Sequence, residues 1–69
     1  MFNKNMTQNE IKNALNEINK MLHFHIEQCY KYIDELYEMY TSNEIILNDE
    51  NEHYMFFLID KYNVIMNEM

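Results

Sequence analysis

The chain contains no glycine and no proline among its 69 residues. Glycine serves backbone positions with positive φ, and proline interrupts helices and strands. A chain without either residue lacks the usual means of building tight hairpins, βα turns and phosphate-binding loops. The sequence therefore predicts an all-α fold in which Asn, Asp, Ser and Thr form the connections between helices.

The length predicts a single helical domain over residues 1–69 with a small core. Residues 1–6 precede the first helix signal and are expected to be flexible. The one cysteine, Cys29, excludes an intramolecular disulfide, and the first residues lack the apolar segment of a secretory signal. The longest apolar run, 54–59, is too short to cross a bilayer. We therefore expect a cytoplasmic protein with a reduced thiol.

A long apolar repeat begins directly after a helix start signal. Thr7 and Glu10 have the spacing of a capping box. Behind them an apolar residue recurs every three or four positions, at Ile11, Leu15, Ile18, Leu22, Ile26, Cys29, Ile33, Leu36 and Tyr40. Because this spacing has no interruption, it predicts one helix over about 8–40, roughly 50 Å long at 1.5 Å per residue.

The segment after residue 40 favours a turn followed by a second helix. Thr41, Ser42 and Asn43 favour helix ends, and Asn43 can adopt the left-handed conformation that glycine usually supplies. The apolar triplet 45–47 is compatible with an extended clamp across the end of a bundle, but we favour a short helical turn over about 44–48. The apolar spacing then resumes and predicts a helix over about 50–68.

The two predicted helices have matching apolar seams, which favours an antiparallel helical hairpin. The first helix is much longer than the second, so a single hairpin would leave part of its apolar face uncovered. Two hairpins can cover each other's apolar faces in a four-helix bundle. We therefore expect a homodimer.

Acidic residues are concentrated in the second half of the chain. The net charge is −7, and residues 32–60 hold eight acidic residues and no lysine. Direct binding to nucleic acid or to an anionic membrane requires clustered cations, so neither is expected. The charge instead favours a protein partner with a basic surface, including a surface that otherwise binds nucleic acid.

A two-helix hairpin would also leave several large apolar side chains exposed. Burying one Phe side chain is worth about 1.5–3 kcal/mol, so such residues favour a partner surface that covers them. The expected apolar contacts are Phe24, Tyr30, Tyr37, Phe56, Phe57 and Val64. The expected acidic rim around them is Glu38, Glu44, Asp49, Glu50 and Glu52.

The residues with reactive side chains give a weak metal signal. His25 and Cys29 are four positions apart, and His53 could add a third ligand. A structural zinc site usually has two close ligand pairs, whereas this chain has one, and Cys29 lies in the middle of the apolar repeat, where cysteine behaves as a small hydrophobic residue. We therefore predict no metal site, no cofactor and no enzymatic activity.

These patterns favour a non-enzymatic protein–protein interaction module. It would be a small acidic regulator or inhibitor, of the kind that a phage or mobile element encodes. Two alternatives stay open: an obligate structural or chaperone-like subunit of a larger assembly, and a metal-dependent sensor that uses His25, Cys29 and His53.

Overall fold

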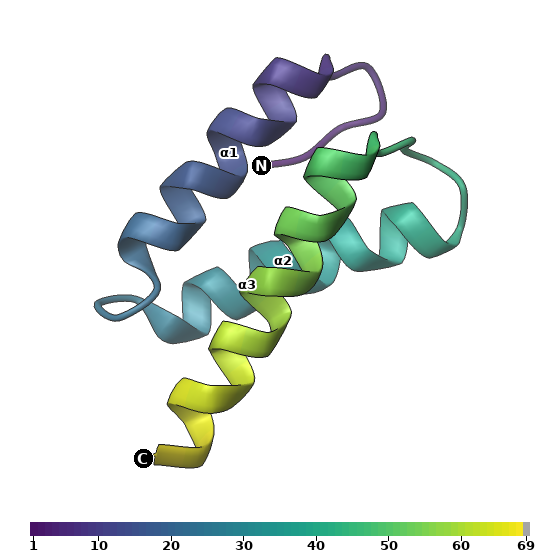
Figure 1. Cartoon of the computed structure of the whole chain (residues 1–69). Coiled ribbons are helices and arrows are strands. Elements are labelled where there is room, and N and C mark those ends of the chain that lie inside the picture. Colours follow the sequence, from purple (N-terminus) through teal and green to yellow (C-terminus); the bar gives the residue numbers. More distant parts are fainter. Residues whose placement is uncertain (69) are drawn as a thin grey trace.

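The computed structural model describes residues 1–68 and contains three helices (Figure 1). They are α1 (Gln8–Met21), α2 (Ile26–Thr41) and α3 (Asp49–Glu68). Helices α1 and α3 run side by side in the same direction, and α2 returns behind them, so that each helix contacts the other two. Residues 1–68 contain no strand, and the all-α prediction is confirmed.

The prediction of one helix over 8–40 is wrong, because the chain leaves the helix after Met21 and enters α2 at Ile26. The backbone amides of Phe24 and His25 both donate to the Met21 carbonyl, at 2.9 and 2.8 Å, and close the end of α1. Leu22 is fully buried and Ile26 is half-buried, on either side of this turn. The apolar spacing therefore passes through the turn unchanged, which explains why periodicity does not reveal it.

This turn replaces the two-helix hairpin with a three-helix arrangement. Because α1 folds back against α2, the apolar face of the 8–40 segment is covered within one chain. The length mismatch that favoured a four-helix dimer is absent. Dimerisation stays a prediction, but the unequal length of the two predicted helices no longer supports it.

Two of the helix starts are capped by polar side chains. The capping box at α1 is confirmed: the Glu10 amide donates to Thr7 Oγ1 at 3.1 Å, and the Thr7 amide donates to Glu10 Oε1 at 2.9 Å. At α3, the amide of Asn51 donates to Asn48 Oδ1 at 2.9 Å. The helix predicted over 50–68 is confirmed, with its first residue at Asp49.

The connection from α2 to α3 begins at a left-handed residue. Asn43 has φ 63°, as the sequence predicts for the residue after a helix end. The amides of Asn43 and Glu44 donate back to the carbonyls of Tyr40 and Met39, at 3.3 and 2.9 Å, which is the Schellman pattern.

The short helical turn predicted over 44–48 is wrong. Residues 46–48 have no regular secondary structure, and Ile45 and Leu47 are buried while Ile46 between them is 82% exposed. This alternation is typical of extended backbone. The triplet therefore closes one end of the core in the extended form that the sequence left as the alternative.

The core lies between the three helices and takes residues from every segment. It consists of Phe2, Ile11, Leu15, Ile18, Leu22, Cys29, Ile33, Leu36, Ile45, Leu47, Met55 and Leu58. Phe2 belongs to the segment expected to be flexible, yet its side chain is buried and its amide donates to Glu35 Oε1 at 3.3 Å. No helix within residues 1–68 has the length and apolar character needed to cross a membrane.

Candidate functional site

A groove of about 280 Å³ lies between α2 and α3. Four residues of each helix line it: Tyr30, Ile33, Asp34 and Tyr37 from α2, and Phe56, Ile59, Tyr62 and Asn63 from α3. We call these eight residues the α2–α3 groove. Both sets repeat every three or four positions, so each set forms one stripe along its helix.

Aromatic pairs link the two helices across the groove. Tyr30 stacks on Tyr62, with ring centroids 4.9 Å apart and planes inclined at 26°. Tyr37 meets Phe56 edge to face at 6.4 Å and 77°. The two α2 tyrosines are seven positions apart, which corresponds to roughly 10 Å along the helix. The pairs therefore bound a short stretch of groove, and Ile33 between them is buried.

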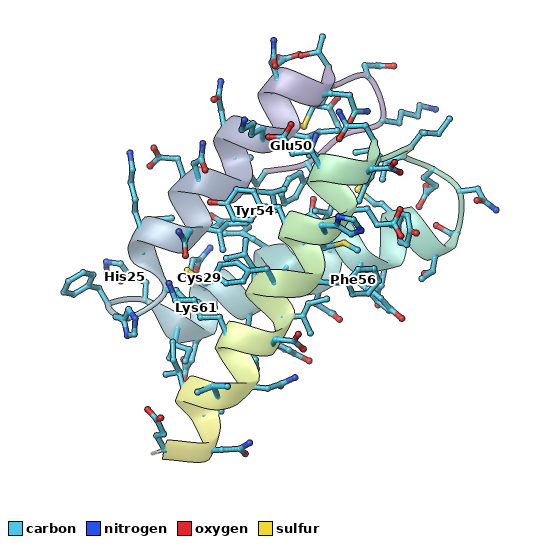
Figure 2. All side chains as sticks on the ribbon, viewed as in Figure 1. His25, Cys29, Glu50, Tyr54, Phe56 and Lys61 are labelled. Carbon is cyan, nitrogen blue, oxygen red and sulfur yellow. The ribbon has the colours of Figure 1, made fainter. Side chains whose placement is uncertain are left out.

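These rings are only partly covered by the protein. Tyr30, Tyr37 and Phe56 keep 46%, 41% and 40% of their surface exposed. All three are among the apolar contacts that the sequence predicts, and the structure brings them together. Figure 2 shows Phe56 on the opposite side of α3 from Tyr54 and Lys61, which face α1.

One carboxylate lines the groove and two others lie near it. Asp34 is the charged side chain that lines the groove in the described part of the chain, and Glu38 follows it one turn along α2. Next to Phe56, the Tyr40 ring lies at 6.3 Å in an edge-to-face contact. Burial raises the pKa of the Tyr40 hydroxyl, and a hydrogen bond to Glu52 with the charge of that carboxylate raises it further. Two members of the predicted acidic rim, Glu38 and Glu52, therefore lie near the groove.

The other predicted apolar contacts lie elsewhere. Phe24 is 80% exposed in the turn between α1 and α2. Phe57 lies near Tyr54, with ring centroids 6.2 Å apart, and Lys61 Nζ is 5.9 Å from the centre of the Phe57 ring. Val64 is exposed and does not line the groove.

The remaining acidic residues predicted for the rim gather at the α2–α3 connection and the start of α3. Glu44 Oε2 accepts a hydrogen bond from Ser42 Oγ at 3.0 Å, and Glu50 pairs with Lys12 of α1. Asp49 and Glu50 lie in the first turn of α3, where negative charge favours the helix dipole. These carboxylates therefore have local structural partners.

The structure does not bring the three weak metal candidates together. His25 precedes α2 at an exposed turn, and His53 is exposed on α3, whereas Cys29 lies inside the fold (Figure 2). Cys29 Sγ donates to the Ile18 carbonyl at 3.6 Å, and burial raises the pKa of this thiol. Within residues 1–68 no group of three or more His, Cys, Asp or Glu side chains could hold a metal ion.

Sequence reasoning missed a set of polar contacts between α1 and α3. The amide of Asn51, whose side chain is 1% exposed, donates through Nδ2 to the Gln8 carbonyl at 3.0 Å and to Gln8 Oε1 at 2.8 Å. Three more side-chain pairs follow along the same helices: Lys12–Glu50, Asn16–Tyr54 and Asn19–Lys61. The sequence signal for Asn51 is its position four residues before Met55, on the apolar seam of α3.

Sequence reasoning also missed five lining residues of the groove, namely Ile33, Asp34, Ile59, Tyr62 and Asn63. The available signal was helical spacing: Ile33, Asp34 and Ile59 are three or four positions from a predicted contact, and Tyr62 and Asn63 are three and four positions from Ile59. A comparison with protein-family models, curated proteins and solved structures finds no match to the chain. The groove presents aromatic rings, two isoleucine side chains and one carboxylate.

Proposed function

We propose that this chain is a small, acidic, non-enzymatic interaction module that binds another protein through the α2–α3 groove and thereby regulates or inhibits it. The observation that carries the proposal is the partly exposed aromatic set Tyr30, Tyr37 and Phe56, drawn from two helices to one groove. Tyrosine is enriched at binding hot spots because its ring adds a large contact area and its hydroxyl adds a hydrogen bond.

The energy of covering these rings supports binding by a partner. Full burial of one Phe side chain is worth about 1.5–3 kcal/mol, and Phe56 leaves 40% of its surface exposed. Several half-exposed rings side by side therefore offer a few kcal/mol to a surface of matching shape. Phe24, which is exposed in the turn between α1 and α2, does not line the groove, and single exposed apolar residues of this kind are common on protein surfaces.

The charge of the chain supports a basic target. At a net charge of −7, the protein attracts a positively charged surface and repels anionic ones. Glu38 lies one turn along α2 from Asp34, and Glu52 is hydrogen-bonded to Tyr40, whose ring contacts Phe56. As part of a charged rim they would mainly affect the association rate and its salt dependence.

Affinity capture with two neighbouring phenylalanine variants tests this proposal. Phe56→Ala alters the groove, and Phe57→Ala removes a more exposed ring, at 53%, from outside it. We expect specific proteins from a lysate of the source cells to be retained by the wild type and by Phe57→Ala, and lost with Phe56→Ala. Circular dichroism and thermal unfolding establish that both variants stay folded.

Two results contradict the proposal. In one, Phe56→Ala retains the same proteins as the wild type. In the other, nothing is enriched over an unrelated acidic protein of similar size. Comparing Phe56→Ala with Phe57→Ala separates binding in the groove from non-specific hydrophobic binding, because both variants lose the same aromatic group.

A further inference from the structure

We propose that the α2–α3 groove binds one arginine side chain from a basic segment of the partner protein, with the guanidinium group between the aromatic pairs and paired with Asp34. This inference rests on the proposed function, since it specifies the chemistry of the segment that the module binds. Size, charge and the shape of the aromatic walls support it.

The size of the groove fits one long side chain. Its volume of about 280 Å³ lies just below the range of about 300–1,000 Å³ that is typical of small-molecule and cofactor sites. The Tyr30–Tyr62 and Tyr37–Phe56 pairs close it at two ends. Ile33 and Ile59 form an aliphatic base, against which the methylene stem of an arginine can pack.

The charges around the groove favour a cation. Asp34 lines it, Glu38 lies one turn further along α2, and Glu52 and Asp60 lie one turn to either side of Phe56 on α3. The basic side chains of the two helices are Lys31, which follows Tyr30, His53, three positions before Phe56, and Lys61, which precedes Tyr62. Lys61 is directed to α1, where its Nζ donates to Asn19 at 2.8 Å. The carboxylates therefore outnumber the cations along both walls.

A purely apolar ligand group fits this surface less well. Covering Asp34 with an apolar group would remove water from a carboxylate without giving it a partner, which carries a large cost. A cationic group avoids that cost because it supplies both an opposite charge and hydrogen-bond donors. The aromatic faces add a cation–π attraction when the charge lies within about 6 Å of a ring centre.

Arginine matches the arrangement better than lysine. Its guanidinium group is planar, stacks on aromatic faces and can donate two parallel hydrogen bonds to one carboxylate. The lysine ammonium is a strongly hydrated point charge that loses more hydration on entering an aromatic groove. A second copy of this chain cannot supply the group, because the sequence contains no arginine and each copy carries a net charge of −7.

The probe for the test is N-acetyl-arginine amide, titrated into isotope-labelled protein and followed by two-dimensional NMR. Its matched control is N-acetyl-citrulline amide, which has the same length and shape without the charge. We expect saturable shifts at Tyr30, Asp34 and Phe56 with the arginine probe. The citrulline probe should bind about tenfold more weakly, since a cation–π contact and a partly exposed ion pair together account for about that factor.

Two charge variants make the test specific. Asp34→Asn removes the ion pair and leaves the cation–π contact, so it should lower the affinity for the arginine probe several-fold and bring it closer to that for the citrulline probe. Glu17→Gln removes the same unit of charge from α1, where Glu17 pairs with Lys20 outside the groove, and should leave the affinity unchanged. Both positions are exposed, and thermal unfolding verifies that each variant is folded.

The inference is overturned if both probes bind equally, if Asp34→Asn binds arginine as the wild type does, or if the shifts lie outside the groove. Its failure is distinguishable from failure of the proposed function. If partner capture depends on Phe56 while the arginine probe does not bind, the interaction module stands and only the arginine assignment falls. If capture does not depend on Phe56, the proposed function falls whatever the probe shows.

Discussion

The buried amide of Asn51 provides the sharpest test of how α3 is attached to α1. Its Nδ2 donates to the Gln8 carbonyl and to Gln8 Oε1, while its Oδ1 has no hydrogen-bond partner within the described residues. Asn51→Asp keeps the shape of the side chain and replaces this double donor with a carboxylate oxygen. Two acceptors of Gln8 would then face a negative charge at a position that is 1% exposed.

The expected loss follows from these contacts. Two hydrogen bonds contribute about 1 kcal/mol each, and a buried charge without a partner costs about 3–5 kcal/mol. Because these contributions overlap, we expect Asn51→Asp to lower the free energy of unfolding by about 3–5 kcal/mol near neutral pH. At about 0.05–0.15 kcal/mol per residue, a chain of this length has only about 3–10 kcal/mol in total. The variant should therefore be close to unfolding.

The loss should depend on pH in a defined direction. Burial raises the folded-state pKa of the new carboxyl above its unfolded value of about 3.9, so the folded state binds the proton more strongly. The destabilisation is therefore smallest below about pH 4 and grows as the pH rises through the folded-state pKa. The protonated carboxyl can also donate one hydrogen bond to Gln8.

Asn48→Asp is the matched control for this experiment. Asn48 is exposed, and its Oδ1 accepts a hydrogen bond from the backbone N–H of Asn51. Aspartate can accept the same hydrogen bond at a helix start. Urea unfolding followed by circular dichroism, at about pH 4 and about pH 7, gives the difference between the two variants. If that difference is under about 1 kcal/mol at neutral pH, or does not shrink in acid, our account of the α1–α3 interface is wrong.

Three further predictions concern the caps and the core. Thr7→Ala should lower the free energy of unfolding by about 1 kcal/mol in urea titrations. The backbone amide of Thr7, and to a lesser extent its hydroxyl, hold the pKa of Glu10 below its usual value. This stabilisation is present above the unfolded-state pKa and is lost as the pH falls, so the wild type should lose stability in acid more steeply than Glu10→Gln, which has no carboxyl group to titrate at this position. Asn43→Ala should cost about 1–2 kcal/mol because φ is 63°, and Asn43→Gly should cost none, as thermal unfolding will show. The Cys29 thiol, buried and with a raised pKa, should react with a thiol reagent far more slowly in the native protein than in urea, and equal rates would contradict its burial.

Local chemistry was the predictable part of this fold. The capping box at Thr7 and Glu10 and the left-handed Asn43 are each determined by residues close in sequence. The third helix was equally clear, because its apolar spacing and its polar start lie together. The buried apolar positions of α1 and α2 also agree with the seam that periodicity predicts.

The turn between α1 and α2 could not be predicted from periodicity alone. It contains neither glycine nor proline, α2 has no side-chain cap, and the seam continues from Leu22 to Ile26 with helical spacing. The available hint was Phe24, a large aromatic residue that does not fit the apolar repeat of the predicted helix. The energy that decides between one long helix and two packed helices is tertiary, since folding back buries the seam within the chain.

The groove was predictable only in part, for a related reason. The sequence identified Tyr30, Tyr37 and Phe56 as exposed aromatic residues and predicted that their two helices pair, but it did not show which stripes of the two helices face each other. Asp34 does not belong to the apolar repeat of the 8–40 segment, and only the packing of α3 against α2 makes it a lining residue of the groove. A residue's neighbours on its own helix follow from spacing, whereas its neighbours across an interface follow from packing.

The two interfaces of α3 differ in how they can respond to a ligand. Towards α1, donors and acceptors are matched pair by pair from Gln8 to Asn19, so a slide by one turn would break every bond at once. Towards α2, the contacts near the groove are between rings, which can rotate about their side-chain torsions without moving the backbone. The α1 side of α3 is therefore held in one register, whereas the α2 side can rearrange its side chains. A ligand in the groove would change side-chain torsions and leave the positions of the helices unchanged.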